Sequence, residues 1–183
     1  MLAWLLAAIA ASTLFAGSAT SQSLSPERRL VEAFRKFCVA TAAEPVRVHA
    51  AIDEMVGLSR PDIISYGSGD VVWSTEILDS IGRTDPHQRL LITFGSRPGV
   101  NMRTRICQVN VPWGEKAKLV SEVVTSLNLA DGTSSVVREG QYDTDLTRWK
   151  TRIVDTEAVI ELGMPTYSGA AGRALTLSLT EGQ

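Results

Sequence analysis

Apolar and polar side chains alternate through the stretch Val100–Pro112, which is the pattern of a β-strand with one buried face. Its apolar residues occupy even positions up to Ile106 and odd positions from Cys107 onward. Because the side chains of a strand point to alternate faces, this change requires an extra residue, and we predict a β-bulge at Ile106–Cys107. Cys107 then points inward, and Pro112, which lacks a backbone N–H, ends the strand.

Three other stretches have the spacing of amphipathic helices. The first begins at Ser25-Pro26, with serine as the N-cap and proline as the first helical residue. The second begins at Pro45 and ends at Gly57, and the third spans Trp113–Asn128. Their apolar faces are Leu30, Phe34, Phe37 and Cys38; Val48, Ile52, Met55 and Val56; and Val120, Val123, Val124 and Leu127. The short link between the first two predicts a helical hairpin.

Between the second and third helices, alternation predicts an antiparallel meander. Val71–Leu78 and Leu90–Phe94 are the strands that precede the one described above. Tyr66–Asp70 and Gly95–Gly99 are rich in glycine, and we expect turns there.

The segments Leu146–Val154 and Glu157–Gly163 predict a β-hairpin around the turn Asp155-Thr156. In that register Trp149 faces Leu162, and the other apolar side chains also meet across the strands, as cross-strand packing requires.

Ala130–Asp145 is polar, and we expect a loop or an irregular hairpin; Ala174–Leu179 alternates and is the last predicted strand. The order helix, helix, strands, helix, strands predicts an α+β fold. We expect an antiparallel β-sheet with an N-terminal helical hairpin and one further helix packed on it.

The start of the chain has the composition of a secretory signal peptide. Met1–Phe15 is apolar and carries no charged side chain, and the small residues Ala16–Ala19 follow. We assign residues 1–21 to the signal peptide and residues 22–183 to a single α+β domain, with cleavage after Ala19 or Ser21. No Lys or Arg precedes the apolar run, so a retained membrane anchor is the alternative, although the run is shorter than the ~20 residues of a bilayer span.

Export places the two cysteines, Cys38 and Cys107, in an oxidising compartment, where a pair of cysteines commonly forms a disulfide. A bond between them stabilises the folded state by about 4 kcal/mol in the chain-entropy treatment. Two separate free thiols are the alternative.

The composition restricts the function. A net charge of −2 over 183 residues argues against a nucleic-acid partner, because dedicated nucleic-acid binders are usually strongly basic. His49 and His87 are the only histidines, and with the cysteines they match no zinc-site spacing, so we expect no metal and surface positions for both. No glycine-rich nucleotide-binding motif is present in the sequence, and we expect no cofactor.

A stripe of basic residues is the most suggestive polar feature. The candidate anion-binding or partner-binding face comprises Arg148, Lys150, Arg152, Arg103 and Arg105. The first three lie at i, i+2 and i+4 of a strand and so point from one face. Arg103 and Arg105 extend that face if the two strands are neighbours. The alternative is a solvated sheet face whose charges pair with Glu157 and Glu161.

The run Phe34–Thr41 (FRKFCVAT), followed by a second short helix, resembles the opening of small exported bacterial proteins of unknown function. They have a leader, an F-x-x-x-C helix and a second Cys in a later strand. The resemblance implies an envelope location, periplasmic or secreted, and carries no activity.

We therefore expect an exported binding or accessory module without a catalytic site. Its partner is an unidentified protein or an anionic envelope ligand, and it has no membrane span once the leader is removed. One alternative is an envelope hydrolase that uses carboxylates or a hydroxyl of Ala130–Asp145; the other is a structural subunit of an envelope assembly.

Overall fold

The computed structural model describes residues 24–59, 62–68, 72–78, 89–99, 102–112, 114–139, 142–165 and 172–182 of the chain. The helical elements are α1 (Pro26–Phe34), the π-helix η1 (Arg35–Val39), α2 (Pro45–Ser59) and α4 (Lys116–Leu127). The strands are β1 (Asp62–Ser68), β2 (Val72–Leu78), β3 (Leu90–Gly99), β4 (Met102–Val111), β5 (Thr133–Glu139), β6 (Tyr142–Ile153), β7 (Thr156–Pro165) and β8 (Arg173–Gly182). The predicted signal peptide lies outside the described residues.

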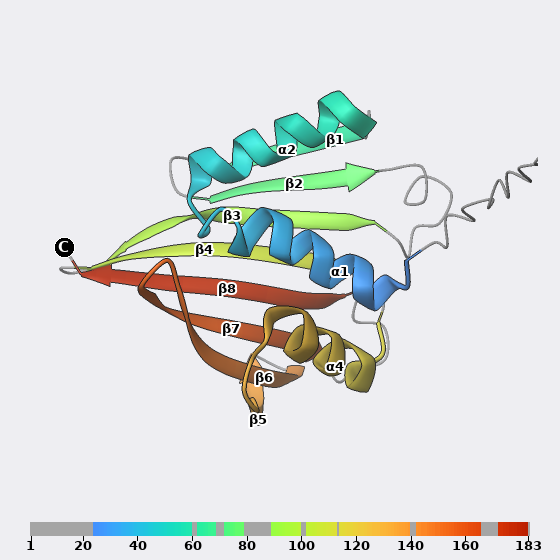
Figure 1. Cartoon of the computed structure of the whole chain (residues 1–183), viewed down its shortest axis with the longest axis vertical. Coiled ribbons are helices and arrows are strands. Elements are labelled where there is room, and N and C mark those ends of the chain that lie inside the picture. The colour runs from blue at the N-terminus through green and yellow to red at the C-terminus, as the bar shows by residue number, and fades with distance from the viewer. Residues whose placement is uncertain are drawn as a thin grey trace, which may run out of the picture.

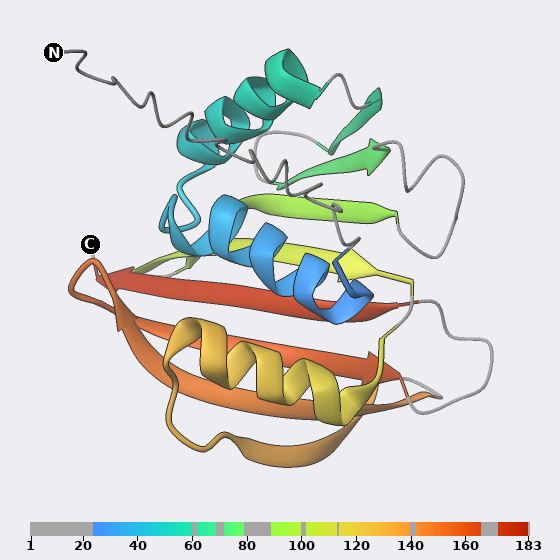
Figure 2. The same ribbon diagram turned by 45° about the vertical axis from the view of Figure 1, so that its right-hand side comes forward.

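The eight strands form one antiparallel sheet in the order β1-β2-β3-β4-β8-β7-β6-β5. The α-helices all lie on the same side of it (Figures 1 and 2). Helix α2 contacts β3, α1 contacts β4, β8 and α4, and α4 lies in front of β6 and β7 in both views. The structure therefore confirms the α+β class and the antiparallel sheet.

The sheet consists of two similarly built halves. In each half a helix precedes a four-stranded meander, β1–β4 in the first half and β5–β8 in the second. The halves meet where β4 pairs with β8, from Met102 opposite Gly182 to Val111 opposite Arg173. No repeat is evident in the sequence, so the two halves share their order of elements and not their residues.

The core fills the space between the sheet and the helices. Side chains of α1 and η1 predicted to share an apolar face, Leu30, Phe34 and Phe37, are at most 1% exposed. They lie against the inward-facing positions of the strands. Those include Ile77, Ile92, Phe94, Cys107, Val109, Ile160, Leu162, Leu175, Leu177 and Leu179. Ser25 caps α1 as predicted, because its hydroxyl accepts a hydrogen bond from the backbone N–H of Arg28.

The predicted β-bulge in β4 is wrong. The register with β3 runs without interruption from Phe94 opposite Cys107 to Gly95 opposite Ile106, and the register with β8 is equally regular. All odd-numbered residues of β4 therefore face the helices, including Arg105, whose guanidinium bonds Glu44 at 3.2 Å beyond the apolar core. The apolar pattern changed because Arg105 has a charged partner on the helical side, and not because the backbone changes face.

The predicted hairpin forms, but its register is shifted by two residues. The turn residues are Val154 and Asp155, with φ of 48° and 64°, and Trp149 faces Ile160 instead of Leu162. Two successive residues with positive φ give the turn twist that suits a two-residue hairpin. Because the shift is even, each side chain keeps the face that the sequence assigned to it.

Other boundaries differ because strand pairing and helix packing outweigh local composition. Helix α2 continues past the predicted stop at Gly57 to Ser59, and α4 begins at Lys116, later than predicted. The predicted turns at Tyr66–Asp70 and Gly95–Gly99 lie largely within β1 and β3, where the backbone is paired with a neighbour. The polar segment Ala130–Asp145 forms β5 and the start of β6, nearer to the hairpin alternative.

Candidate functional site

The sheet has one face covered by helices and one face, here called the open face, that no described helix covers (Figure 2). Alternation along β8 separates the two. Leu175, Leu177 and Leu179 are fully buried against the helices, whereas Thr176 and Ser178 are half-buried on the open face. Strand β8 is therefore polar on the open face, and no described helix covers its side chains there.

The basic residues of β6 share one face of the strand, and that face belongs to the open face of the sheet. Trp149 and Ile153 point into the core, at 2% and 9% exposure. Arg148, Lys150 and Arg152 alternate with them and are exposed.

Arg103 and Arg105 do not extend this stripe. They share the helical face with Cys107, and β8 and β7 separate β4 from β6. Arg103 donates a hydrogen bond to Ser96 Oγ at 2.9 Å, and Arg105 pairs with Glu44. The candidate face is thus reduced to the β6 residues.

Strand β7 supplies carboxylates beside the stripe. The register places Arg148 opposite Glu161, Lys150 opposite Val159 and Arg152 opposite Glu157. Arg148 Nε donates to Glu161 Oε1 at 2.6 Å, and a second nitrogen of the guanidinium contacts the same oxygen. The charge of Arg148 is therefore compensated by Glu161. For this residue the structure agrees with the alternative prediction, a solvated face whose charges are paired.

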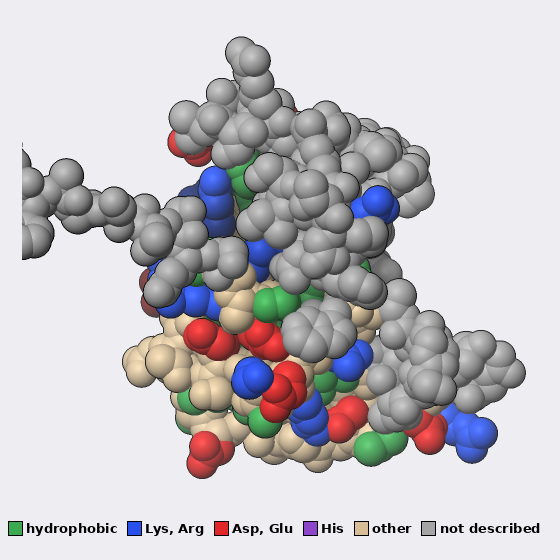
Figure 3. All heavy atoms as spheres, turned by 90° about the vertical axis from the view of Figure 1, so that its right-hand side faces the viewer, with side chains coloured by type: hydrophobic (Ala, Val, Ile, Leu, Met, Phe, Trp, Pro, Cys, Tyr) green, Lys and Arg blue, Asp and Glu red, His purple; other side chains and the backbone are tan. Residues whose placement is uncertain are grey.

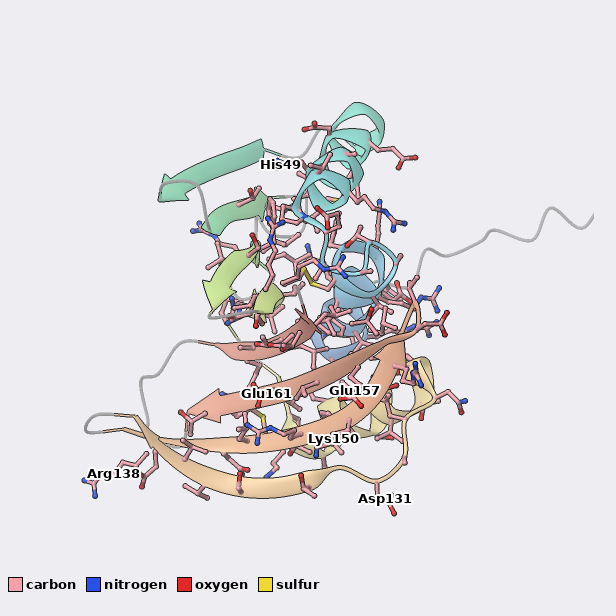
Figure 4. The ribbon with its side chains drawn as sticks, turned by 90° about the vertical axis from the view of Figure 1, so that its left-hand side faces the viewer. His49, Asp131, Arg138, Lys150, Glu157 and Glu161 are labelled. Carbon is pink, nitrogen blue, oxygen red and sulfur yellow. A yellow bond between two sulfur atoms is a disulfide. The ribbon has the colours of Figure 1, made fainter. Side chains whose placement is uncertain are left out.

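Lys150, Arg152 and Glu157 behave differently. Within the part of the chain that the structure describes, no ion pair engages any of the three, although Arg152 donates to the carbonyl of Asp155 at 2.8 Å. Figure 4 shows Lys150 and the two glutamates on the neighbouring strands β6 and β7. A hollow of about 650 Å³ lies here, lined by Lys150, Thr151, Arg152, Glu157, Ala158, Val159, Ser178 and Thr180.

These groups suit recognition by charge and hydrogen bonding. An ammonium and a guanidinium bind anionic oxygens, whereas hydroxyls and a carboxylate bind the hydroxyl groups of a ligand. The sequence reasoning missed Ser178 and Thr180. Their alternation with the leucines of β8 places them on a polar face, but only the strand order brings that face beside Lys150.

The histidines and aspartates show no catalytic arrangement in the described residues. His49 is half-buried, and its ring lies nearly perpendicular to that of Phe94, with ring centroids 4.7 Å apart, so it is less exposed than a surface histidine would be; His87 lies outside the described residues. No group of three or more potential metal-ligating side chains occurs in the described segments. Lys116 engages the carboxylate of Asp145, and the hydrolase alternative stays a prediction.

Cys38 and Cys107 form the predicted disulfide, with Cα atoms 5.4 Å apart and both residues 0% exposed. The bond joins η1 to β4 beneath the helices. Neither sulfur is a thiol, so the alternative of two free thiols and any cysteine nucleophile are absent from this structure.

A buried acid, Glu27, connects α1 to α4. Burial raises the pKa of its carboxyl group, but hydrogen bonds from the backbone N–H groups of Glu115 and Glu27 and from Ser25, together with the charge of Lys118, outweigh burial. The pKa of Glu27 therefore lies below its ordinary value of 4.5. The carboxylate accepts a hydrogen bond from the Glu115 N–H at 3.1 Å, at the N-terminus of α4, where negative charge is favourable.

On the face of the molecule shown in Figure 3, acidic and basic side chains lie next to one another.

No protein-family model, curated protein or solved structure matches this chain. No helix among the described residues is long and apolar enough to cross a membrane. The resemblance to small exported bacterial proteins therefore remains a prediction.

Proposed function

We propose that this protein is an exported binding or accessory module that recognises an anionic group on a partner protein or an envelope polymer. The observation that carries the proposal is the hollow on the open face, where Lys150 and Arg152 have no carboxylate partner among the described residues and lie beside the hydroxyls of Ser178 and Thr180. The two unpaired cations and the two hydroxyls lie close enough together to contact a single anionic group.

Periplasmic or secreted localisation is part of the proposal. A fully buried disulfide supports it, because disulfides persist in oxidising compartments and are rare in the cytosol. The apolar composition of residues 1–21 supports it as well. We also propose that α1, η1 and α2 form the helical hairpin, since the chain reverses at residues 40–43 and α2 contacts η1.

Recognition then works through one fixed and two adaptable groups. Arg152 is oriented by its hydrogen bond to the Asp155 carbonyl and presents its remaining donors. Lys150 adds a point charge, and Glu157 repels ligands of very high negative charge while accepting hydroxyl donors. A polymer with spaced carboxylates and many hydroxyls fits this set best.

The test is biolayer interferometry on immobilised polygalacturonate, which carries carboxylates and hydroxyls, with uncharged dextran as the reference surface. The protein is expected to bind polygalacturonate, with an affinity that falls as salt rises. Lys150→Glu/Arg152→Glu is expected to weaken binding at least about tenfold, which corresponds to about 1.4 kcal/mol.

Arg35→Glu/Lys36→Glu is the matched control, because it makes the same change of charge on the helical side of the molecule. Arg148 stays unchanged, because reversing it breaks its ion pair with Glu161 and obscures the result. Equal loss in both double variants would show that only net charge matters, and the open face would then not be the site.

The structural-subunit alternative also has one observation in its favour. Strand β5 is an edge of the sheet, and Val136 and Val137 on it are 65% and 38% exposed. An edge strand has unpaired backbone groups, so β5 can pair with a strand of another chain, and its two valines would then be covered. Light scattering after size-exclusion chromatography, on the wild type and on Val136→Lys, tests this: self-association that the lysine abolishes supports the subunit role, and a monomer at all concentrations opposes self-assembly.

A further inference from the structure

A groove on the helical side, far from the open face, lies between α1 and α2. Its walls are one face of α1 and η1 on one side and Met55 of α2 on the other, and Leu90 of β3 contributes to its floor. Its volume is about 630 Å³, within the range of about 300–1,000 Å³ typical of small-molecule sites. The lining residues are Arg29, Glu32, Ala33, Arg35, Lys36, Phe37, Ala40, Met55 and Leu90.

The base of the groove is apolar and preformed. Ala33, Phe37 and Leu90 are 8%, 1% and 5% exposed, so they are held in the core and present only their outer atoms. Met55 and Ala40 are more exposed and form the upper apolar edges. Along α1 and η1 the lining spans residues 29–40, roughly 16 Å at the rise of a helix, which gives an elongated apolar channel.

The rim of the groove is cationic. Arg35 and Lys36 are exposed and have no carboxylate partner among the described residues. The Lys36 ammonium lies 5.3 Å from the centroid of the Phe37 ring, directly beside the apolar base. The carboxylate of Glu32 is already engaged by Arg28, with Nε to Oε1 at 3.1 Å, and so offers these cations little compensation.

We propose that this groove binds a single-chain amphiphile with a carboxylate head group, such as a fatty acid. The acyl chain lies along Ala33, Phe37 and Met55, and the carboxylate pairs with Arg35 and Lys36. Apolar contact accounts for the chain, and charge complementarity for the head group. Neither a fully polar anion nor an uncharged chain would use both parts of the groove.

The experiment is titration of the full-length exported protein with dansyl-labelled undecanoic acid, followed by fluorescence, with its uncharged methyl ester as the comparison probe. The acid is expected to bind at least about tenfold more tightly than the ester. Arg35→Glu/Lys36→Glu is expected to remove that preference, and Ala40→Trp, which fills one end of the channel, to weaken both probes.

Lys150→Glu/Arg152→Glu is the matched control, and it is expected to bind the acid as the wild type does. Failure of polygalacturonate binding therefore leaves this proposal intact, and the reverse also holds. Circular dichroism and the mass of the unreduced protein check that each variant folds with its disulfide. Equal affinity for acid and ester, or unchanged binding by Ala40→Trp or by Arg35→Glu/Lys36→Glu, would overturn the proposal.

Discussion

Replacing both cysteines by alanine, Cys38→Ala/Cys107→Ala, is expected to destabilise the protein mainly through the unfolded chain. The bond links residues 69 positions apart. A loop of that length lowers the entropy of the unfolded chain by an amount worth about 4 kcal/mol at room temperature. Against a typical total stability of about 5–15 kcal/mol, this leaves the variant marginally stable. The double variant avoids leaving a single buried thiol beside a cavity.

Urea unfolding followed by circular dichroism measures the effect. With a slope of about 2 kcal/mol per molar urea, a loss of about 4 kcal/mol lowers the unfolding midpoint by about 2 M. The slope itself is expected to increase in the variant, because an unfolded chain without the bond exposes more surface. Both sulfurs are fully buried, so the wild type in reductant is expected to keep its disulfide until it unfolds.

A midpoint that moves by less than the equivalent of 1 kcal/mol, with an unchanged slope, would refute this reasoning. It would mean that the unfolded chain already holds Cys38 and Cys107 close together, or that strain in the native bond cancels its benefit.

Three further outcomes follow from single positions. Glu27→Gln is expected to lower the free energy of unfolding by about 1 kcal/mol near neutral pH, because the backbone N–H of Glu115 then donates to an uncharged acceptor. Since the pKa of Glu27 is lowered on folding, the wild type keeps this contribution above pH 4.5 and loses it as the pH falls through the folded-state value; the difference between the two proteins therefore disappears in acid. Val154→Asn is expected to raise the free energy of unfolding by about 1 kcal/mol, because valine is unfavourable at φ 48°. Gly132→Ala is expected to lower the free energy of unfolding by about 1–3 kcal/mol, because the Cβ of the new alanine would lie 2.6 Å from Trp149 Nε1.

Thermal and urea unfolding measure all three, and each has its own contradicting result. If the difference in free energy of unfolding between the wild type and Glu27→Gln did not change with pH, the charge of Glu27 would not be the cause of its contribution. No gain in Val154→Asn would mean that the exposed valine is unstrained in its turn. A stable Gly132→Ala would show that the indole of Trp149 moves at little cost.

The sequence was most informative where one local signal sufficed. Ser25-Pro26 predicted the start of α1, and alternation assigned the inward faces of β3, β6 and β8. The sequence was misleading where pairing with a distant strand determines the local backbone conformation. Gly95 reads as a turn, yet it lies within β3 opposite Ile106.

The candidate site shows the same division. The shared face of Arg148, Lys150 and Arg152 follows from a period of two and was predictable. Whether Arg103 joins them depends on which strands are neighbours, and β8 pairs with β4 from far along the chain. The α1–α2 groove was not predicted either, because it depends on how two helices diverge over a sheet.

The position of β8 has a consequence for the order in which the chain becomes ordered. Of the eight strands β8 is synthesised last, yet it lies between β4 and β7 and supplies Leu175, Leu177 and Leu179 to the shared core. Until β8 has been synthesised, β4 and β7 each lack one pairing partner, and the two halves of the sheet are not joined. Such a chain gains its full set of non-local contacts only after its last strand has been made, so the two halves of the sheet cannot join while synthesis is still in progress.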